Sequence, residues 1–380
     1  MRKDHGTQAT VMKLAHCPPD RIRAKMRIEG QKDVSMKRRG RTLFAISLGA
    51  VLTVLGPALA QETVEKFYSG KTVRVVVGYP PASTFDTYAR ILARYLPPHI
   101  PGAPTVIVQN MPGAGSLTAT GYVANVAPRD GTVVAMINPV NTTEPLLDPE
   151  RAKFDPRAFS WIGSMNREIS TCAFWTNKIA NLDDLRAKEA VLGGTGPASG
   201  STIDAKTLER VLGLKLKLVT GYPGLTEVRL AAERGEVDGH CGLLVSAIKT
   251  DVWDDFQKGK IKVPVQMAVE KHPELANVPN AFDLVASDAD RNLLKLVFGP
   301  WSFGRPLVAP PAIPEDRLKA LRAAFQETLQ DPKFQEEAKR INLEVQPVTA
   351  ERISELLADL YKTPQPVIEQ ARQVLGIGNR

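Results

Sequence analysis

Residues 72–96 read TVRVVVGYPPASTFDTYARILARYL, and the fold class follows from this stretch. Its beginning, Thr72–Gly78, is rich in β-branched residues and almost continuously apolar, which is typical of a strand buried on both faces. Prolines and hydroxyl side chains follow, so a loop is expected at residues 80–84. The spacing of apolar residues then predicts a helix over Phe85–Leu96. A buried strand, a loop and an amphipathic helix in this order indicate an α/β protein.

The same alternation continues along the chain and then recurs. Strands are expected at Thr105–Gln109 and Thr132–Ile137, with a helix at Leu117–Val126 between them. This order predicts a parallel sheet. A second α/β unit is predicted from strands at Ala190–Gly193, Leu216–Val219 and Val237–Leu244 and helices at Ser201–Leu212 and Thr226–Arg234. Two further helical patterns follow, at Leu318–Leu329 and Ala350–Ala358.

The net charge of +8 over 380 residues is concentrated in the first 60 residues. These hold 12 Lys and Arg against 4 Asp and Glu, whereas residues 61–380 hold 37 of each sign. Residues 36–60, MKRRGRTLFAISLGAVLTVLGPALA, have the cationic start, apolar stretch and small-residue end of a secretory signal peptide. We therefore expect residues 1–60 to be leader and signal peptide, cleaved near Ala60. The mature protein is then periplasmic and near neutral, and nucleic acid is not expected as a partner.

Two features of the exported chain stay open at the level of sequence. Residues 1–35 precede the signal, which leads to the hypothesis that translation starts at Met36 or Met26. Export also places Cys172 and Cys241 in an oxidising compartment, where they could pair. The alternative is two separate buried thiols.

Two loops are candidates for ligand binding because ligands of open α/β sheets bind beyond the carboxyl ends of the strands. One is Tyr79–Asp86, and the other is Gly194–Thr202, which is rich in Gly, Ser and Thr. Free N–H groups and the helix dipole favour anions at such loop–helix junctions. The plainer alternative is that the polar residues there are only helix caps: Thr84, Asp86, Ser201 and Thr202.

Patterns typical of catalysis are missing from the sequence. There is no phosphate-binding G-x-x-x-x-G-K-[ST] loop, no G-x-S-x-G and no H-E-x-x-H. His99, His240 and His272 lie too far apart for a local metal motif. We expect no catalytic residues, no metal and no cofactor.

Several segments together resemble one family: GYPPASTFDTYARILARYL, VIVQNMPGAGSLTATGYVANVAPRDGT, GTGPASGS, VTGYPG, RGEVDGHCG and FGRPLVAPPAIP. In this order they are similar to the extracytoplasmic substrate-binding proteins of tripartite tricarboxylate transporters, the Bug family. The resemblance implies a type-2 periplasmic-binding-protein fold, in which two α/β domains close over a ligand. It also implies that organic carboxylates bind in the interdomain cleft through backbone amides, hydroxyls and waters.

The resemblance assigns domain bounds and ligand contacts by position. Domain 1 is expected at residues 71–166 plus 305–380 and domain 2 at 167–304, with crossings near Ile169–Phe174 and Ser302–Val308. The implied contacts of domain 1 are Tyr79, Pro81, Ala82, Ser83 and Thr84, with Asp86 shaping the loop and Asn138 joining it. Those of domain 2 are Thr195, Gly196, Ser199, Gly200, Ser201, Tyr222, Pro223 and Gly224. The chain departs from the family in carrying Ala82-Ser83-Thr84 where a run of glycines is usual, so hydroxyls are expected to replace some amide donors.

The leading hypothesis is thus a monomeric receptor that captures a small di- or tricarboxylate and delivers it to the membrane subunits of a tripartite transporter or to a sensor. An exported enzyme acting on small organic acids is the alternative, with Asp86 and Asp238 as its only acids near loop ends. A third hypothesis is an adaptor whose main partner is another protein.

Overall fold

The computed structural model describes residues 62–196 and 199–377. The predicted leader and signal peptide, residues 1–60, lie outside the described residues, so they remain a prediction. Within the described part, no helix is both long and apolar enough to cross a membrane.

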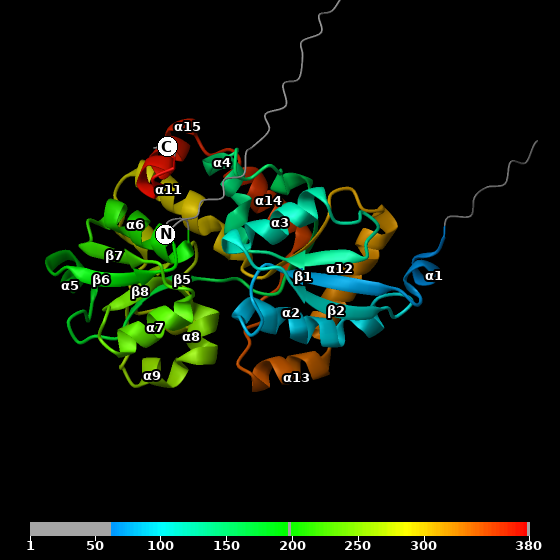
Figure 1. Ribbon diagram of the computed structural model, residues 1–380, viewed down its shortest axis with the longest axis horizontal. Coiled ribbons are helices and arrows are strands. Elements are labelled where there is room, and N and C mark those ends of the chain that lie inside the picture. The colour runs from blue at the N-terminus through cyan, green and yellow to red at the C-terminus, as the bar shows by residue number, and fades with distance from the viewer. Residues whose placement is uncertain (1–61, 197–198, 378–380) are drawn as a thin grey trace, which may run out of the picture. The chain divides into compact units, whose positions relative to one another are not determined.

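One sheet of six strands is built from the two ends of the described chain (Figure 1). Its order is β11-β4-β10-β3-β1-β2. The strands are β1 Thr72–Val77, β2 Thr105–Asn110, β3 Val133–Met136, β4 Ser160–Ser164, β10 Pro306–Ala309 and β11 Val348–Thr349. The predicted buried strand forms β1, in which Val73, Val75, Val76 and Val77 are fully buried.

A second sheet of five strands is built from the middle of the chain, in the order β7-β6-β8-β5-β9. Its strands are β5 Ser170–Phe174, β6 Ala190–Gly194, β7 Leu216–Thr220, β8 Gly239–Leu244 and β9 Lys262–Met267. Cys172 of β5 faces Cys241 of β8 in the antiparallel register, and a disulfide bond joins the two residues.

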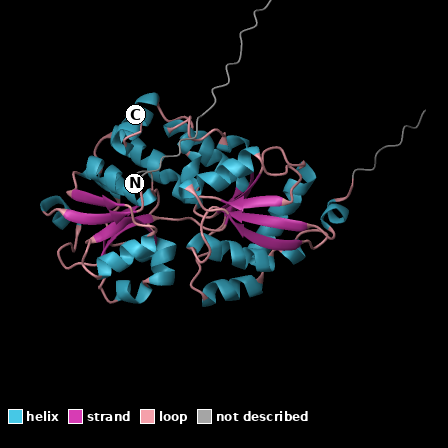
Figure 2. Ribbon diagram, viewed as in Figure 1, coloured by secondary structure: helices cyan, strands magenta, loops and turns pink. Residues whose placement is uncertain are grey.

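Helices lie against both faces of the two sheets (Figure 2). The α-helices are α1 Val64–Tyr68, α2 Thr84–Tyr95, α3 Leu117–Asn125, α4 Glu144–Leu147, α5 Leu182–Ala187, α6 Gly200–Leu212, α7 Leu225–Glu233, α8 Val245–Asp251, α9 Trp253–Gln257, α10 Ala281–Leu284, α11 Asp288–Phe298, α12 Glu315–Gln330, α13 Pro332–Arg340, α14 Ala350–Leu360 and α15 Gln365–Leu375. The short 3₁₀ helices are η1 Pro97–His99, η2 Ala114–Ser116, η3 Pro139–Thr142, η4 Pro156–Ala158, η5 Pro273–Leu275 and η6 Gly299–Phe303.

The predicted parallel pairing is confirmed for the three strands predicted in each unit, whereas the strands that were not predicted pair antiparallel. β1 pairs in parallel with β2 and β3, and β6 does so with β7 and β8. In contrast, β10 runs antiparallel to β3, and β5 runs antiparallel to β8. These two strands directly follow the segments that carry the chain from one sheet to the other, so they enter their sheets without a covering helix that would make the connection parallel.

Candidate functional site

Both sheets place their middle parallel strand between two strands that follow it in sequence. β1 lies between β2 and β3, and β6 lies between β7 and β8. The chain therefore leaves these strands in opposite directions, which opens a crevice at their carboxyl ends. All the loops predicted to hold ligand follow such ends: residues 78–84 follow β1, Asn138 follows β3, residues 195–199 follow β6, and residues 221–224 follow β7.

Asp86 holds the first loop together. Its buried carboxylate accepts hydrogen bonds from the backbone N–H of Ala82 at 2.8 Å, from Arg90 Nε at 2.7 Å and from Asn110 Nδ2 at 2.8 Å. Asn110 Nδ2 also donates to the carbonyl oxygen of Tyr79 at 2.9 Å. Burial raises the pKa of Asp86, but the hydrogen bonds outweigh it, so the pKa lies below its usual value. A charged Asp86 thus fixes both ends of the loop.

The residues that replace the usual glycines adopt the conformations that the loop requires. Ala82 has a φ of 63°, in the left-handed region that glycine enters at no cost. Ser83 is the N-cap of α2, and its hydroxyl oxygen accepts the N–H of Asp86 at 3.2 Å. The cap is therefore Ser83, and the alternative that Thr84 and Asp86 are caps is wrong, because both lie inside α2.

Tyr79 and Asn138 meet across the gap between β1 and β3. Asn138 Nδ2 donates to the Tyr79 hydroxyl oxygen at 2.7 Å, and the Asn138 backbone N–H donates to Ser116 Oγ at 3.2 Å. The Tyr79 ring stacks on Phe85 with its centroid 4.4 Å away. Burial raises the pKa of Tyr79 to about 12, against the opposing effects of Arg305 and Asn138. The hydroxyl therefore stays protonated at neutral pH.

The second loop is a cluster of hydroxyls at the start of α6. Ser199 is the N-cap, and its hydroxyl lies 2.8 Å from the carbonyl oxygen of Gly196 and 3.0 Å from Ser201 Oγ. Ser201 and Thr202 lie inside α6, so they are not its caps. The N–H of Tyr222 donates to the carbonyl oxygen of Gly194 at 3.3 Å, which joins the loop after β7 to the loop after β6.

The structure thus gathers the predicted residues into two groups, one at each sheet. Tyr79, Asn138 and residues 81–84 form the first, and residues 195–196, 199–201 and 222–224 form the second, with Gly224 as the N-cap of α7. Within residues 62–196 and 199–377, no hydrogen bond or ring contact joins one group to the other directly. That a ligand bridges them remains a prediction.

The two acids considered for an enzyme serve the structure instead. Asp86 holds the first loop, and Asp238 Oδ2 accepts the N–H of Val191 at 2.7 Å and the Lys178 ammonium at 3.1 Å. Among the described residues, no cluster of three His, Cys, Asp or Glu side chains could hold a metal ion.

Three buried charged residues near the loops were not predicted. Asp204 of α6 is 3% exposed and accepts a hydrogen bond from Ser170 Oγ, and burial raises its pKa to about 7. Glu168 and Arg305 lie on the two segments that connect the sheets, and their side chains are 1% and 0% exposed. The sequence gives no sign that a single charged residue is buried, because burial depends on how distant parts of the chain pack around it.

A groove of about 370 Å³ borders the first loop. It lies between α2 and α13, and its lining residues all belong to the first sheet's side of the chain, among them Pro81, Ala82, Arg90 and Glu337. None of the residues that line this groove belongs to the second loop.

Comparisons with known proteins give a consistent assignment. A family model described as tripartite tricarboxylate transporter family receptor matches residues 99–373. A UPF0065 protein of Cupriavidus necator is 22% identical over 354 residues, covering 85% of this chain and 94% of its own length.

Solved structures with the same fold include two named binding proteins. The periplasmic binding protein BugD is 22% identical, with a TM-score of 0.59, covering 82% of this chain and 99% of its own. MatC from Rhodopseudomonas palustris with bound malate is 21% identical, with a TM-score of 0.57, covering 80% and 99%. The likeness confirms the predicted α/β fold of two-domain periplasmic binding proteins.

Proposed function

Because this chain belongs to the tripartite tricarboxylate transporter receptor family, we propose that it captures a small organic di- or tricarboxylate and delivers it to such a transporter. The family consists of periplasmic solute-binding proteins and not of enzymes. The alternative of an exported enzyme is therefore wrong for this chain.

The chemistry of the two loops supports a carboxylate ligand. Residues 78–84 and 194–202 contain no charged side chain, but both are rich in hydroxyls and stand at the start of a helix. Such a site binds an anion through hydroxyl and amide donors, aided by the helix dipole. MatC, which has the same fold, holds malate.

In the proposed complex, the ligand first binds one loop group and then bridges both as the domains, residues 71–166 plus 305–380 and residues 167–304, close over it. Its carboxylates accept from Ser83 and Thr84 on one side and from Ser199 and Ser201 on the other. A wrong acid leaves some of these buried groups unpaired, and this is the source of specificity. The receptor then acts as a monomer that presents its closed form to the membrane subunits or to a sensor.

A thermal-shift screen with malate, citrate and adipate tests the ligand class, with the diamide of malate as a neutral control. At about 100 times its Kd, a ligand stabilises the folded state by about 2.7 kcal/mol, which raises the Tm by several degrees. The diamide should leave the Tm unchanged. If none of a broad panel of di- and tricarboxylates raises the Tm, the proposed ligand class is wrong.

A double variant tests the site itself. Ser83→Ala with Ser201→Ala should remove most of the ligand-induced shift, measured from the variant's own Tm because Ser83 also caps α2. Ser354→Ala is the matched control, since the Ser354 hydroxyl donates to the Ala350 carbonyl oxygen within its own helix, α14. An undiminished shift in the double variant would place the ligand elsewhere.

A further inference from the structure

Arg305 is a fully buried arginine at the junction of the two sheets. It follows η6 and precedes β10, on the segment that carries the chain back from the second sheet to the first. Its side chain has no exposed surface. A buried guanidinium is expensive unless it is paired, so its partners indicate what it holds in place.

On the side of the second sheet, Arg305 is tied to the start of α8. Its Nη2 donates to Ser246 Oγ at 2.9 Å and lies 3.2 Å from Glu168 Oε2. Glu168 Oε1 also accepts the backbone N–H of Ser246 at 3.2 Å. Ser246 follows the carboxyl end of β8, next to β6, so the tie reaches the crevice beside the second loop.

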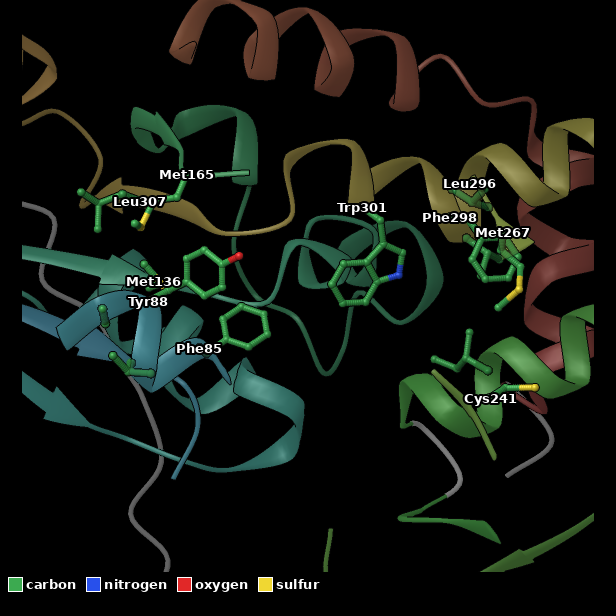
Figure 3. Packing of buried hydrophobic residues seen from close by; sticks show 14 of the residues in the cluster. Phe85, Tyr88, Met136, Met165, Cys241, Met267, Leu296, Phe298, Trp301 and Leu307 are labelled. Carbon is green, nitrogen blue, oxygen red and sulfur yellow. The ribbon is translucent and has the colours of Figure 1, made fainter. Parts of the chain in front are cut away.

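On the side of the first sheet, the same guanidinium lies over two rings of α2. Its central carbon is 4.2 Å from the Phe85 ring centroid and 5.0 Å from that of Tyr88. Figure 3 shows these two rings side by side, both projecting from α2. Phe85 in turn stacks on Tyr79 at 4.4 Å. Cation–π contacts of this kind are strongest where water is excluded, as it is here.

Arg305 therefore touches elements of both crevices, while its hydrogen bonds within the described residues go to neither proposed ligand group. Its Nη1 donates to the carbonyl oxygen of the neighbouring Gly304 at 3.0 Å, and its Nε has no hydrogen-bond partner among the described residues. The chain of contacts runs from Tyr79 through Phe85 and Arg305 to Ser246.

We propose that Arg305 is a positioning residue that couples the first loop to the second sheet. The guanidinium holds the Phe85 end of the first loop in register with α8, so the two loop groups face each other before ligand arrives. Its consequence for carboxylate affinity rests on the proposed function, whereas the coupling itself does not. Without Arg305, binding must order the two parts against each other, which lowers affinity.

Hydrogen–deuterium exchange on the ligand-free protein tests the coupling. The main variant is Arg305→Met with Glu168→Gln, because removing the arginine alone would leave a buried carboxylate unpaired and could prevent folding. Arg317→Met is the matched control: Arg317 lies 3.4 Å over the Phe67 ring and donates to the Asp130 carbonyl at 2.9 Å, away from the second sheet.

The double variant should exchange faster by about tenfold at residues 82–88 and also at 245–250, with the second sheet's β6–β7 pair unchanged. Arg317→Met should leave both segments unchanged. Two results would overturn the proposal. Faster exchange confined to residues 302–308 would mean that Arg305 has only a local role. An equal increase at every segment would mean a global loss of stability.

Calorimetric titration measures the consequence for binding, using malate, citrate or adipate, whichever stabilises the unaltered protein. The double variant should bind about tenfold more weakly at a temperature where it is fully folded, and Arg317→Met should bind normally. Unchanged affinity with altered exchange refutes the effect on binding. If no carboxylate binds the unaltered protein, the proposed ligand class fails, and the exchange experiment alone decides the coupling.

Discussion

Replacing Asp204 by asparagine should make the protein more stable at pH 8 and change how its stability depends on pH. The carboxyl of Asp204 is buried in α6 and accepts a hydrogen bond from Ser170 Oγ. Burial raises its pKa from 3.8 to about 7, because the ionised form loses its hydration. Asparagine keeps an acceptor for Ser170 and cannot ionise.

The magnitude follows from linkage between protonation and folding. Between pH 4 and pH 7 the folded protein holds a proton on Asp204 that the unfolded chain has lost, so the free energy of unfolding falls as pH rises. The difference between 3.8 and about 7 corresponds to about 4 kcal/mol. This stability is fully present below pH 4 and lost above pH 7, and Asp204→Asn should not lose it.

His240 has the opposite effect on stability over nearly the same pH range. It is buried, stacks on Trp175 and places Nδ1 3.0 Å from the Cys241 carbonyl oxygen, and burial lowers its pKa from 6.5 to about 4. The unfolded chain therefore binds the extra proton between pH 4 and 6.5, and stability rises with pH by about 3 kcal/mol. The two residues nearly cancel in the unaltered protein.

Equilibrium urea unfolding at several pH values between 4.5 and 8 is the assay. Relative to the unaltered protein, Asp204→Asn should gain about 3 kcal/mol of stability between pH 4.5 and pH 8, because part of the full change of about 4 kcal/mol lies below pH 4.5. His240→Gln should lose stability as pH rises. Asp254→Asn is the control, since its carboxylate is 87% exposed. If the curves of Asp204→Asn and the unaltered protein run parallel, Asp204 ionises normally and the reasoning is refuted.

Three further variants test the loop and the disulfide by the same unfolding assay. Ala82→Gly should change the free energy of unfolding by less than about 1 kcal/mol, because relief of the left-handed φ offsets the greater freedom of the unfolded chain. A loss above about 2 kcal/mol would contradict the observed φ. Asp86→Asn should lose about 2–3 kcal/mol, because a neutral amide weakens the bonds from Arg90 and Ala82; no loss would mean that the carboxylate is dispensable. Cys172→Ala with Cys241→Ala should lose about 4 kcal/mol for a bond spanning 69 residues, and reductant should then have no further effect.

Much of the fold could be predicted because the pattern is local. The β-branched run of β1 and the amphipathic period of α2 identify these elements to within one residue or so. The strands β5 and β9 were missed, because STCAF is short and polar and KVPVQM contains a proline. The strand conformation of β5 depends on pairing with β8 and β9, and that of β9 depends on pairing with β5. The mixture of parallel and antiparallel strands in each sheet could not be predicted for the same reason, because it also depends on which strands pair.

The candidate site could likewise be predicted in part from the sequence. The loops after β1 and β6 could be located, because a strand followed by glycine, proline and hydroxyls marks the carboxyl edge of a sheet. The role of Ser83 as the N-cap of α2 and the positive φ of Ala82 could not be predicted, because both depend on the path that the backbone takes. The network at Arg305 could not be predicted from the sequence, because its hydrogen bonds join residues that are 59 and 78 positions apart in the chain.

By itself, the sequence determined the α/β class, the positions of the two polar loops, the placement of the whole net charge in residues 1–60 and the resemblance to one receptor family. Each depends on composition or on neighbours within a few residues. Only the tertiary structure decided which charges are buried and with whom they pair, and hence that Asp204 titrates near pH 7 and that Arg305 lies between both sheets. The physical reason is that desolvation depends on what packs around a side chain in space, and those neighbours come from distant parts of the chain.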